Sequence, residues 1–200
     1  MKDATQPKTT RDSILDATDR LLARYGYKKM TIDDLAREVG IGKGSIYLHF
    51  SSKEEIALSH IDRMIERLKA DLVRTAKAST PAETRLHQML TDRVLYRFDN
   101  VQHYSQSLNE LLSHLRPKLL ERRERYFEEE ARIFAAVITE GQAANTLAPG
   151  DSYDLARTLV TATNSLLPYS LSAIELGDRA DLAERAGKTA ELLIRGLARR

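Results

Sequence analysis

The feature that most constrains the fold of this chain is the stretch at residues 31–53, which reads TIDDLAREVGIGKGSIYLHFSSK. Thr31 and Asp34 have the spacing of a capping box, which predicts that a helix begins there. Gly40 can supply the left-handed conformation that ends a helix before a sharp turn. Between these signals, four apolar side chains recur at helical spacing, at Ile32, Leu35, Ala36 and Val39.

A second, shorter helix is expected to run from about Gly42 to Phe50. Ile46 and Phe50 are four residues apart, so they share one face and are expected to point into the core. A helix of about eight residues is roughly 12 Å long, which is about the width of the DNA major groove. The stretch therefore predicts a helix-turn-helix that binds DNA. Its outward face carries hydrogen-bond donors at Lys43, Ser45, Tyr47 and His49.

Two of these donors are expected at base edges. Lys43 can donate to guanine acceptors, and Ser45 can pair with several bases. Gly44 lies between them and would let the start of the helix approach the DNA backbone closely.

The composition gives little independent support for DNA binding. The net charge is only +2, and residues 1–60 hold ten Lys/Arg against nine Asp/Glu, a difference of +1. The carboxylates Asp33, Asp34 and Glu38 lie on the first helix of the motif, and we expect them to point away from the second. The sequence contains no cysteine, no apolar run near the roughly 20 residues of a membrane span and no signal-peptide core, so we expect a soluble, cytoplasmic protein.

The sequence around the motif resembles the DNA-binding segment of the TetR/AcrR family of transcriptional regulators. The matches are I-L-D-A at 14–17, L-L at 21–22, Y-G-Y at 25–27, T-I-D-D-L-A at 31–36, V-G-I at 39–41, K-G-S-I-Y at 43–47, H-F at 49–50 and S-K-E at 52–54. The resemblance covers roughly residues 10–60. It implies contacts to DNA phosphates, which hold register without reading sequence, from Thr31, Tyr47, His49 and Lys53.

The rest of the chain predicts an all-α fold of about nine helices, because no sustained period-two alternation indicates a strand. We expect a helix-turn-helix domain at residues 1–52 and a ligand-binding and dimerisation domain at 53–200. One predicted helix stops before Pro117, where the next one begins. Another predicted helix spans about 151–175 and contains Pro168, which would leave the carbonyl of Asn164 without its donor.

The resemblance also implies a ligand pocket in the second domain. Its candidate wall residues include no clear cluster of buried like charge, so a mostly apolar or aromatic ligand with few charges is expected. Tyrosine hydroxyls, with His87 or His103, would hold it. The candidates for the pocket wall come from the aromatic-rich helices and are Met89, Phe98, Tyr104, Leu108, Phe134 and Tyr169.

A homodimer is expected through the helices at about 151–175 and 179–198, whose apolar stripes could form a four-helix bundle across a two-fold axis. The stripe of the first helix is Leu155, Leu159, Ala162 and Leu166. The stripe of the second helix is Leu182, Ala186, Ala190, Leu193 and Leu197.

Together with these patterns, the resemblance implies a repressor that a small molecule releases from its operator. A DNA-binding regulator without such a ligand, controlled by a protein partner or acting as an activator, stays open as an alternative. An enzyme lacks positive support, because the five histidines form no compact ligand arrangement and no G-x-S-x-G or glycine-rich phosphate loop occurs. No cofactor or metal is expected.

Overall fold

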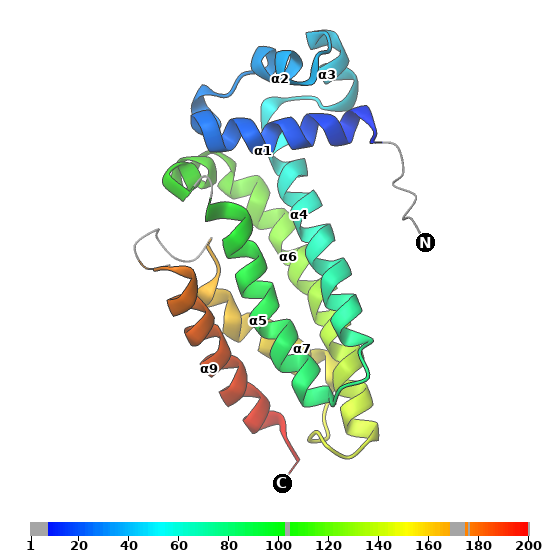
Figure 1. The fold of residues 1–200 in the computed structure, drawn as a ribbon. Helices are drawn as coiled ribbons and strands as arrows, with labels where there is room; N and C mark the ends of the chain where they lie inside the picture. The colour runs from blue at the N-terminus through cyan, green and yellow to red at the C-terminus, as the bar shows by residue number, and fades with distance from the viewer. Residues whose placement is uncertain (1–7, 103–104, 169–174, 176, 200) are drawn as a thin grey trace. The chain divides into compact units, whose positions relative to one another are not determined.

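The computed structural model describes residues 8–102, 105–168, 175 and 177–199, with only the helical backbone for residues 105–110. Within these residues the fold is all-α, with eight α-helices, a short 3-10 turn and no strand, which confirms the predicted fold class. Figure 1 shows the helices, which are α1 (Thr10–Lys29), α2 (Ile32–Val39), α3 (Lys43–His49), α4 (Lys53–Ala76), α5 (Ala82–Val101), α6 (Ser105–Ala143), α7 (Ser152–Thr163), the turn η2 (Asn164–Leu166) and α9 (Arg179–Leu197). No helix in the described residues is both long and apolar enough to cross a bilayer.

The chain divides into two compact units by its internal contacts. The first consists of Met1–Arg63 with Gln106–Arg116, and the second of Met64–Ser105 with Pro117–Arg200. Both α4 and α6 therefore contribute residues to each unit. The division into domains at residue 52 stays a prediction.

The first unit is built around α1, α2 and α3. Capping boxes begin two of these helices, with Thr9 and Asp12 at α1 and Thr31 and Asp34 at α2, as the sequence indicated for α2. Gly40 has a φ of 77°, so the predicted left-handed end of α2 is confirmed. The core of this unit is apolar and fully buried, and it includes Ile14, Leu15, Leu22, Leu35 and Ile46.

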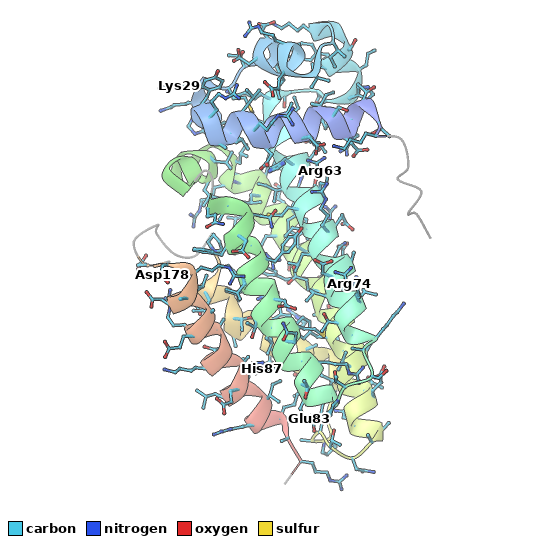
Figure 2. All side chains as sticks on the ribbon, viewed as in Figure 1. Lys29, Arg63, Arg74, Glu83, His87 and Asp178 are labelled. Atoms are coloured by element: carbon cyan, nitrogen blue, oxygen red, sulfur yellow. The ribbon has the colours of Figure 1, made fainter. Side chains whose placement is uncertain are left out.

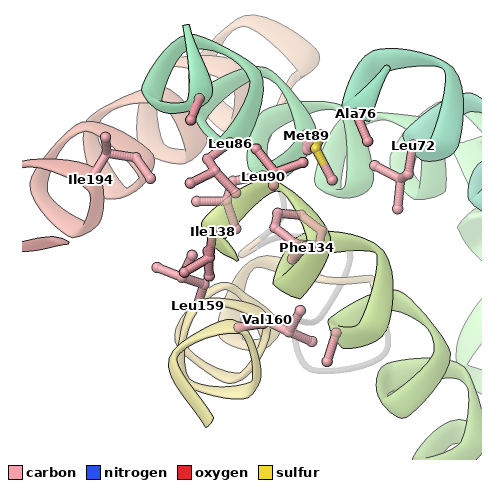
Figure 3. Packing of buried hydrophobic residues seen from close by; sticks show 14 of the residues in the cluster. Leu72, Ala76, Leu86, Met89, Leu90, Phe134, Ile138, Leu159, Val160 and Ile194 are labelled. Atoms are coloured by element: carbon pink, nitrogen blue, oxygen red, sulfur yellow. The ribbon is translucent and has the colours of Figure 1, made fainter. Parts of the chain in front are cut away.

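The second unit has a core to which five helices contribute. Figure 3 shows side chains from α4, α5, α6, α7 and α9 converging around Phe134 and Leu90. The helices α5 and α9 lie side by side along their lengths (Figure 1). The other labelled members of this core are Leu72, Ala76, Leu86, Met89, Ile138, Leu159, Val160 and Ile194.

The predicted helix break before Pro117 is wrong, because α6 runs without interruption from Ser105 to Ala143. A proline inside a helix removes the N–H that would donate to the carbonyl of residue i−4 and costs about 3 kcal/mol. Leu115 and Leu119 flank Pro117 at i, i+4 spacing and are both buried. Their burial favours the continuous helix, so packing outweighs the local cost of the proline.

The predicted helix at 151–175 is also wrong in its extent. The helix α7 ends at Thr163 and is followed by η2. Leu167 then has an extended backbone, with φ −83° and ψ 148°, because Pro168 disfavours the helical conformation in the residue before it. The carbonyl of Asn164 accepts a hydrogen bond from the N–H of Leu167 at 3.2 Å, so it has a donor after all.

Candidate nucleic-acid interface and ligand cavity

The outward face of α3 is the candidate DNA-binding surface. Ile46 and Phe50 are buried, which anchors the helix on the first unit. Because these two side chains point inward, the other side of α3 faces solvent. Tyr47 is 50% exposed, and Lys43 and His49 are also exposed, whereas Ser45 is half-buried.

Gly42 and Gly44 keep the beginning of α3 open. A Cβ atom added at either position would meet no other heavy atom within 4 Å. Packing within the chain therefore does not require glycine at these two positions, in contrast to Gly40, whose positive φ does. This observation is consistent with close approach of a second molecule to the helix start.

The side chain of Lys43 has a partner that the sequence reasoning missed. Its Nζ lies 3.0 Å from Oδ2 of Asp33 on α2, and the hydrogen bond from Lys43 to Asp33 raises the pKa of the lysine above its ordinary value. The expectation that Asp33 points away from α3 is wrong, because the tight turn brings the start of α2 beside the start of α3. A DNA contact by Lys43 therefore requires exchange of this ion pair.

The other two carboxylates of α2 are held by their own neighbours. Asp34 accepts a hydrogen bond from the hydroxyl of Thr31 at 2.6 Å, and this bond lowers the pKa of Asp34. Glu38 accepts from Nε of Arg20 at 2.8 Å, which lowers the pKa of Glu38. Thr31 is thus the N-cap of α2, and its hydroxyl already has the role of capping this helix. The residue is exposed.

Lys53 lies at the start of α4 and makes several contacts within the first unit. Its Nζ donates to the carbonyls of Tyr27 at 3.1 Å, Met30 at 3.2 Å and Lys28 at 3.4 Å. It also lies 4.5 Å from the ring centroid of Tyr27. These contacts satisfy the carbonyls at the C-terminal end of α1. A phosphate contact by Lys53 stays a prediction.

Leu48 is the exposed residue of α3 that the sequence reasoning did not identify. It is 84% exposed, more than Tyr47. The signal was present, because residue 48 is two positions from both Ile46 and Phe50 and so lies on the opposite face of a helix. An apolar side chain on this face can contact the methyl group of thymine.

The residues predicted to line a ligand pocket lie in different surroundings. Met89 and Phe134 are fully buried in the main core of the second unit, and Phe98 packs in a second apolar cluster. None of these three lines the cavities described below. His87 is half-buried and, with Glu83, lines a cavity of about 330 Å³ whose wall comes from α5 and α9; Figure 2 labels both residues on α5. Tyr104, Tyr169, His103 and the side chain of Leu108 lie outside the described residues.

The second unit contains a buried cluster of charges that the sequence did not reveal. Arg93 and Arg97 on α5 both donate to Glu130 on α6, Arg93 at 2.8 Å, and all three residues are 0% exposed. Burial lowers the pKa of Arg93 to about 10. Burial alone would raise the pKa of Glu130, but the two guanidinium groups reverse this effect and lower it. None of these three residues is among those predicted to line the ligand pocket.

A cavity of about 360 Å³ lies between α6, α7 and η2. This volume falls at the lower end of the range for small-molecule sites, about 300–1,000 Å³. Its wall combines apolar, aromatic and charged side chains, namely Leu120, Arg123, Glu124, Phe127, Glu128, Arg157, Val160, Thr161 and Asn164.

The prediction that the apolar stripe of α9 forms the dimer contact is wrong, because most of this stripe is buried within a single chain. Leu182, Ala186 and Ala190 are at most 1% exposed within a single chain and pack in its apolar cores. Periodicity identified the buried face of α9 correctly but not its partner, which is α5 of the same chain. Leu192, on the outer side of α9, is 70% exposed.

Comparisons with known proteins agree with this geometry. The family model described as "Bacterial regulatory proteins, tetR family" matches residues 14–59, which span most of α1 through the start of α4. The chain is 26% identical to the fatty acid metabolism regulator protein of Bacillus subtilis over 92% of this chain and 93% of that protein. It is also 26% identical to the HTH-type transcriptional repressor KstR2 of Mycolicibacterium smegmatis, over 80% of this chain and 78% of that protein.

The overall arrangement of helices is also shared with solved structures. A TetR transcription regulator from Haloarcula marismortui matches with a TM-score of 0.73 over 94% of this chain and 98% of that one. The sequence identity is 23%, so this similarity concerns the fold.

Proposed function

Because the chain belongs to the TetR/AcrR family of transcriptional regulators, we propose that it represses transcription as a homodimer that occupies an operator and that a small molecule releases. The observation that carries the DNA-binding part is the outward face of α3. Lys43, Tyr47, Leu48 and His49 are exposed there, while Gly44 leaves the helix start open. This face combines donors with an apolar contact, as readout in the major groove requires.

Each contact has a distinct expected role. Lys43 and Ser45 would read base edges, and Leu48 would contact a thymine methyl group. Tyr47, His49 and Thr31 would donate to phosphates and fix the register without reading sequence. Lys53 would also donate to a phosphate, from the start of α4, where its ammonium group binds three carbonyls at the end of α1 and at Met30.

Two copies are needed because a single short helix covers only a few base pairs. In a symmetric dimer, two α3 helices would dock in successive major grooves roughly 34–36 Å apart on a pseudo-palindromic operator. The dimer contact would use the outer face of α9 around Leu192. It would also use the members of the stripe predicted at 151–175 that are exposed or half-buried, namely Leu155, Ala162 and Leu166. Repression, rather than activation, of transcription is supported by the M. smegmatis relative, whose name describes a repressor.

Release would require a ligand that favours a conformation of the second unit in which the two heads no longer fit that spacing. The cavity between α6 and α7 supports this step as a site of suitable size. The helices α4 and α6 contribute residues to both units, so a change in either helix would be shared by both.

The test uses operator sequences selected in vitro from random DNA, with fluorescence anisotropy as the binding measurement. Tyr47→Ala should weaken binding to all sequences alike, whereas Lys43→Ala should also relax sequence preference by about 1–3 kcal/mol. Tyr25→Ala is a matched control, because Tyr25 is 45% exposed in the same unit but lies on α1. If Tyr47→Ala and Lys43→Ala bind the selected operator as tightly as the unmodified chain, the assigned interface is wrong.

A further inference from the structure

The buried charges of the second unit do not balance. Arg93 and Arg97 carry two positive charges, and Glu130 carries the only carboxylate that pairs with them among the described residues. The other acceptors of Arg93 are neutral: the hydroxyl of Thr163 at 2.6 Å, the side-chain oxygen of Asn164 at 2.8 Å and the carbonyl of Val160 at 3.2 Å. One positive charge is therefore left without a counter-charge from the described residues.

Arg97 shows the imbalance directly. Its Nη1 donates to the carbonyl of Arg93 and its Nη2 to Glu130. Its Nε is buried and has no hydrogen-bond partner in the part of the chain that the structure describes. A buried ion whose charge is not fully paired costs several kcal/mol. An arrangement with this cost is expected where a second charge of opposite sign binds.

The surplus charge lies directly behind the cavity wall. Arg93 donates to Val160 and Asn164, and its guanidinium carbon lies 5.4 Å from the ring centroid of Phe127. All three of these partners line the cavity between α6 and α7. Because side chains separate Arg93 from the cavity by a single layer, and the interior screens charge less than water, its charge acts on a molecule bound there.

The charged side chains that line the cavity balance in number, with Arg123 and Arg157 against Glu124 and Glu128. Arg157 lines it, is exposed and makes no ion pair with a described residue. Arg123 lies with its guanidinium carbon 5.6 Å from the ring centroid of Phe127. Of the two glutamates, Glu128 has a partner outside the lining, Arg132 at 3.7 Å. The apolar wall consists of Leu120, Phe127 and Val160.

We propose that this cavity binds an organic carboxylate with a short apolar or aromatic tail. The carboxylate would lie near Arg157, facing the wall behind which the surplus positive charge of Arg93, Arg97 and Glu130 is buried, and the tail would pack on the apolar wall. The inference rests on the proposed function, since it names the chemical class of the molecule that releases the operator. It assigns one negative charge to the mostly apolar or aromatic ligand with few charges that is expected from the sequence.

The test compares three probes that share one tail, namely 4-phenylbutyrate, 4-phenylbutan-1-ol and 4-phenylbutylamine. Titration calorimetry on the full chain, without DNA, should show that the carboxylate binds at least about tenfold more tightly than the alcohol, because charge-assisted hydrogen bonds are the stronger ones. The amine should bind most weakly. Equal affinity of the carboxylate and the alcohol would overturn the proposal.

Variants separate the cavity from general surface charge. Arg157→Gln should weaken binding of the carboxylate about five- to tenfold, since a partly screened charged contact is lost. The affinity for the alcohol should stay unchanged. Arg125→Gln is the control, because Arg125 is an exposed arginine of α6 that does not line the cavity. Equal effects of the two variants on the carboxylate would contradict the assignment.

A buried variant tests the surplus charge itself. Arg97→Met keeps the pair of Arg93 with Glu130 and removes the extra positive charge, so the advantage of the carboxylate over the alcohol should shrink severalfold. If this variant does not fold, Arg157→Gln decides the question.

Operator DNA distinguishes the two proposals. A chain that binds operator normally but shows no preference for 4-phenylbutyrate retains its DNA-binding function and refutes the carboxylate site. A chain that binds 4-phenylbutyrate with the expected preference, yet with identical affinity in the presence of operator, confirms the site and refutes its role in release, because linkage requires the two affinities to change together.

Discussion

Replacing Glu130 with glutamine should destabilise this protein far more than the same change at its neighbour Glu129. The substitution keeps the shape of the side chain but removes the one negative charge between Arg93 and Arg97, all of them 0% exposed. Breaking a buried pair in this way costs about 3–5 kcal/mol. For a chain of this size each kcal/mol lowers the melting temperature by about 2–4 °C, so a decrease of roughly 6–20 °C is expected.

Glu129→Gln is the matched control. The side chain of Glu129 is 29% exposed and pairs with Lys69 at 2.5 Å and with Arg125 at 3.9 Å. Solvent screens this pair, so its loss should cost at most about 1 kcal/mol. Both variants are compared by circular dichroism in thermal and urea unfolding at one fixed protein concentration, because the proposed dimer would make stability depend on concentration. Equal losses in the two variants would refute the argument that the buried cluster is an ion network.

Three further predictions follow from other parts of the structure. Gly44→Ala should leave the fold intact and raise the free energy of unfolding by up to about 1 kcal/mol, yet weaken operator binding in anisotropy titrations; unchanged binding would contradict close approach at this point. Leu192→Asp should dissociate the dimer in sedimentation experiments without unfolding the chain, whereas Ala190→Asp should unfold it. The hydrogen bond from Thr31 lowers the pKa of Asp34 in the folded state. The stability that this bond adds is present above the unfolded pKa of about 4 and should be lost as the pH falls through the lower pKa of the folded state. In urea unfolding at a series of pH values, Thr31→Ala should reduce this acid-induced loss.

The parts of the fold that the sequence predicted correctly depend on neighbours in the chain. The capping box of Thr31 and Asp34 and the left-handed Gly40 involve residues within one turn, so their spacing is sufficient to identify them. The inward face of α3 followed from the spacing of Ile46 and Phe50 alone. The same spacing placed Leu48 on the outer face, although its apolar character concealed its candidate role.

The features that the sequence did not predict depend on residues far apart in the chain. Arg93 and Glu130 are separated by 37 positions, and nothing in a helical pattern distinguishes a buried arginine from a solvated one. Periodicity likewise identified the apolar face of α9 but could not show whether α5 or a second chain covers it. At Pro117, burial of Leu115 and Leu119 outweighed the local preference of proline for ending a helix.

The ion pair between Lys43 and Asp33 gives the DNA-binding helix its own counter-ion. A lysine that binds DNA alone displaces condensed cations, and each such contact adds about 0.9 to the slope of log affinity against log salt concentration. A lysine that enters the groove while paired with a carboxylate of the protein contributes almost nothing to that slope until the ammonium and carboxylate groups separate. On DNA of arbitrary sequence the pair should stay closed, so the chain adheres weakly and dissociates soon. Where a guanine offers acceptors to Lys43, we expect the pair to open, and the proposed contact would then favour the operator over the excess of other sites.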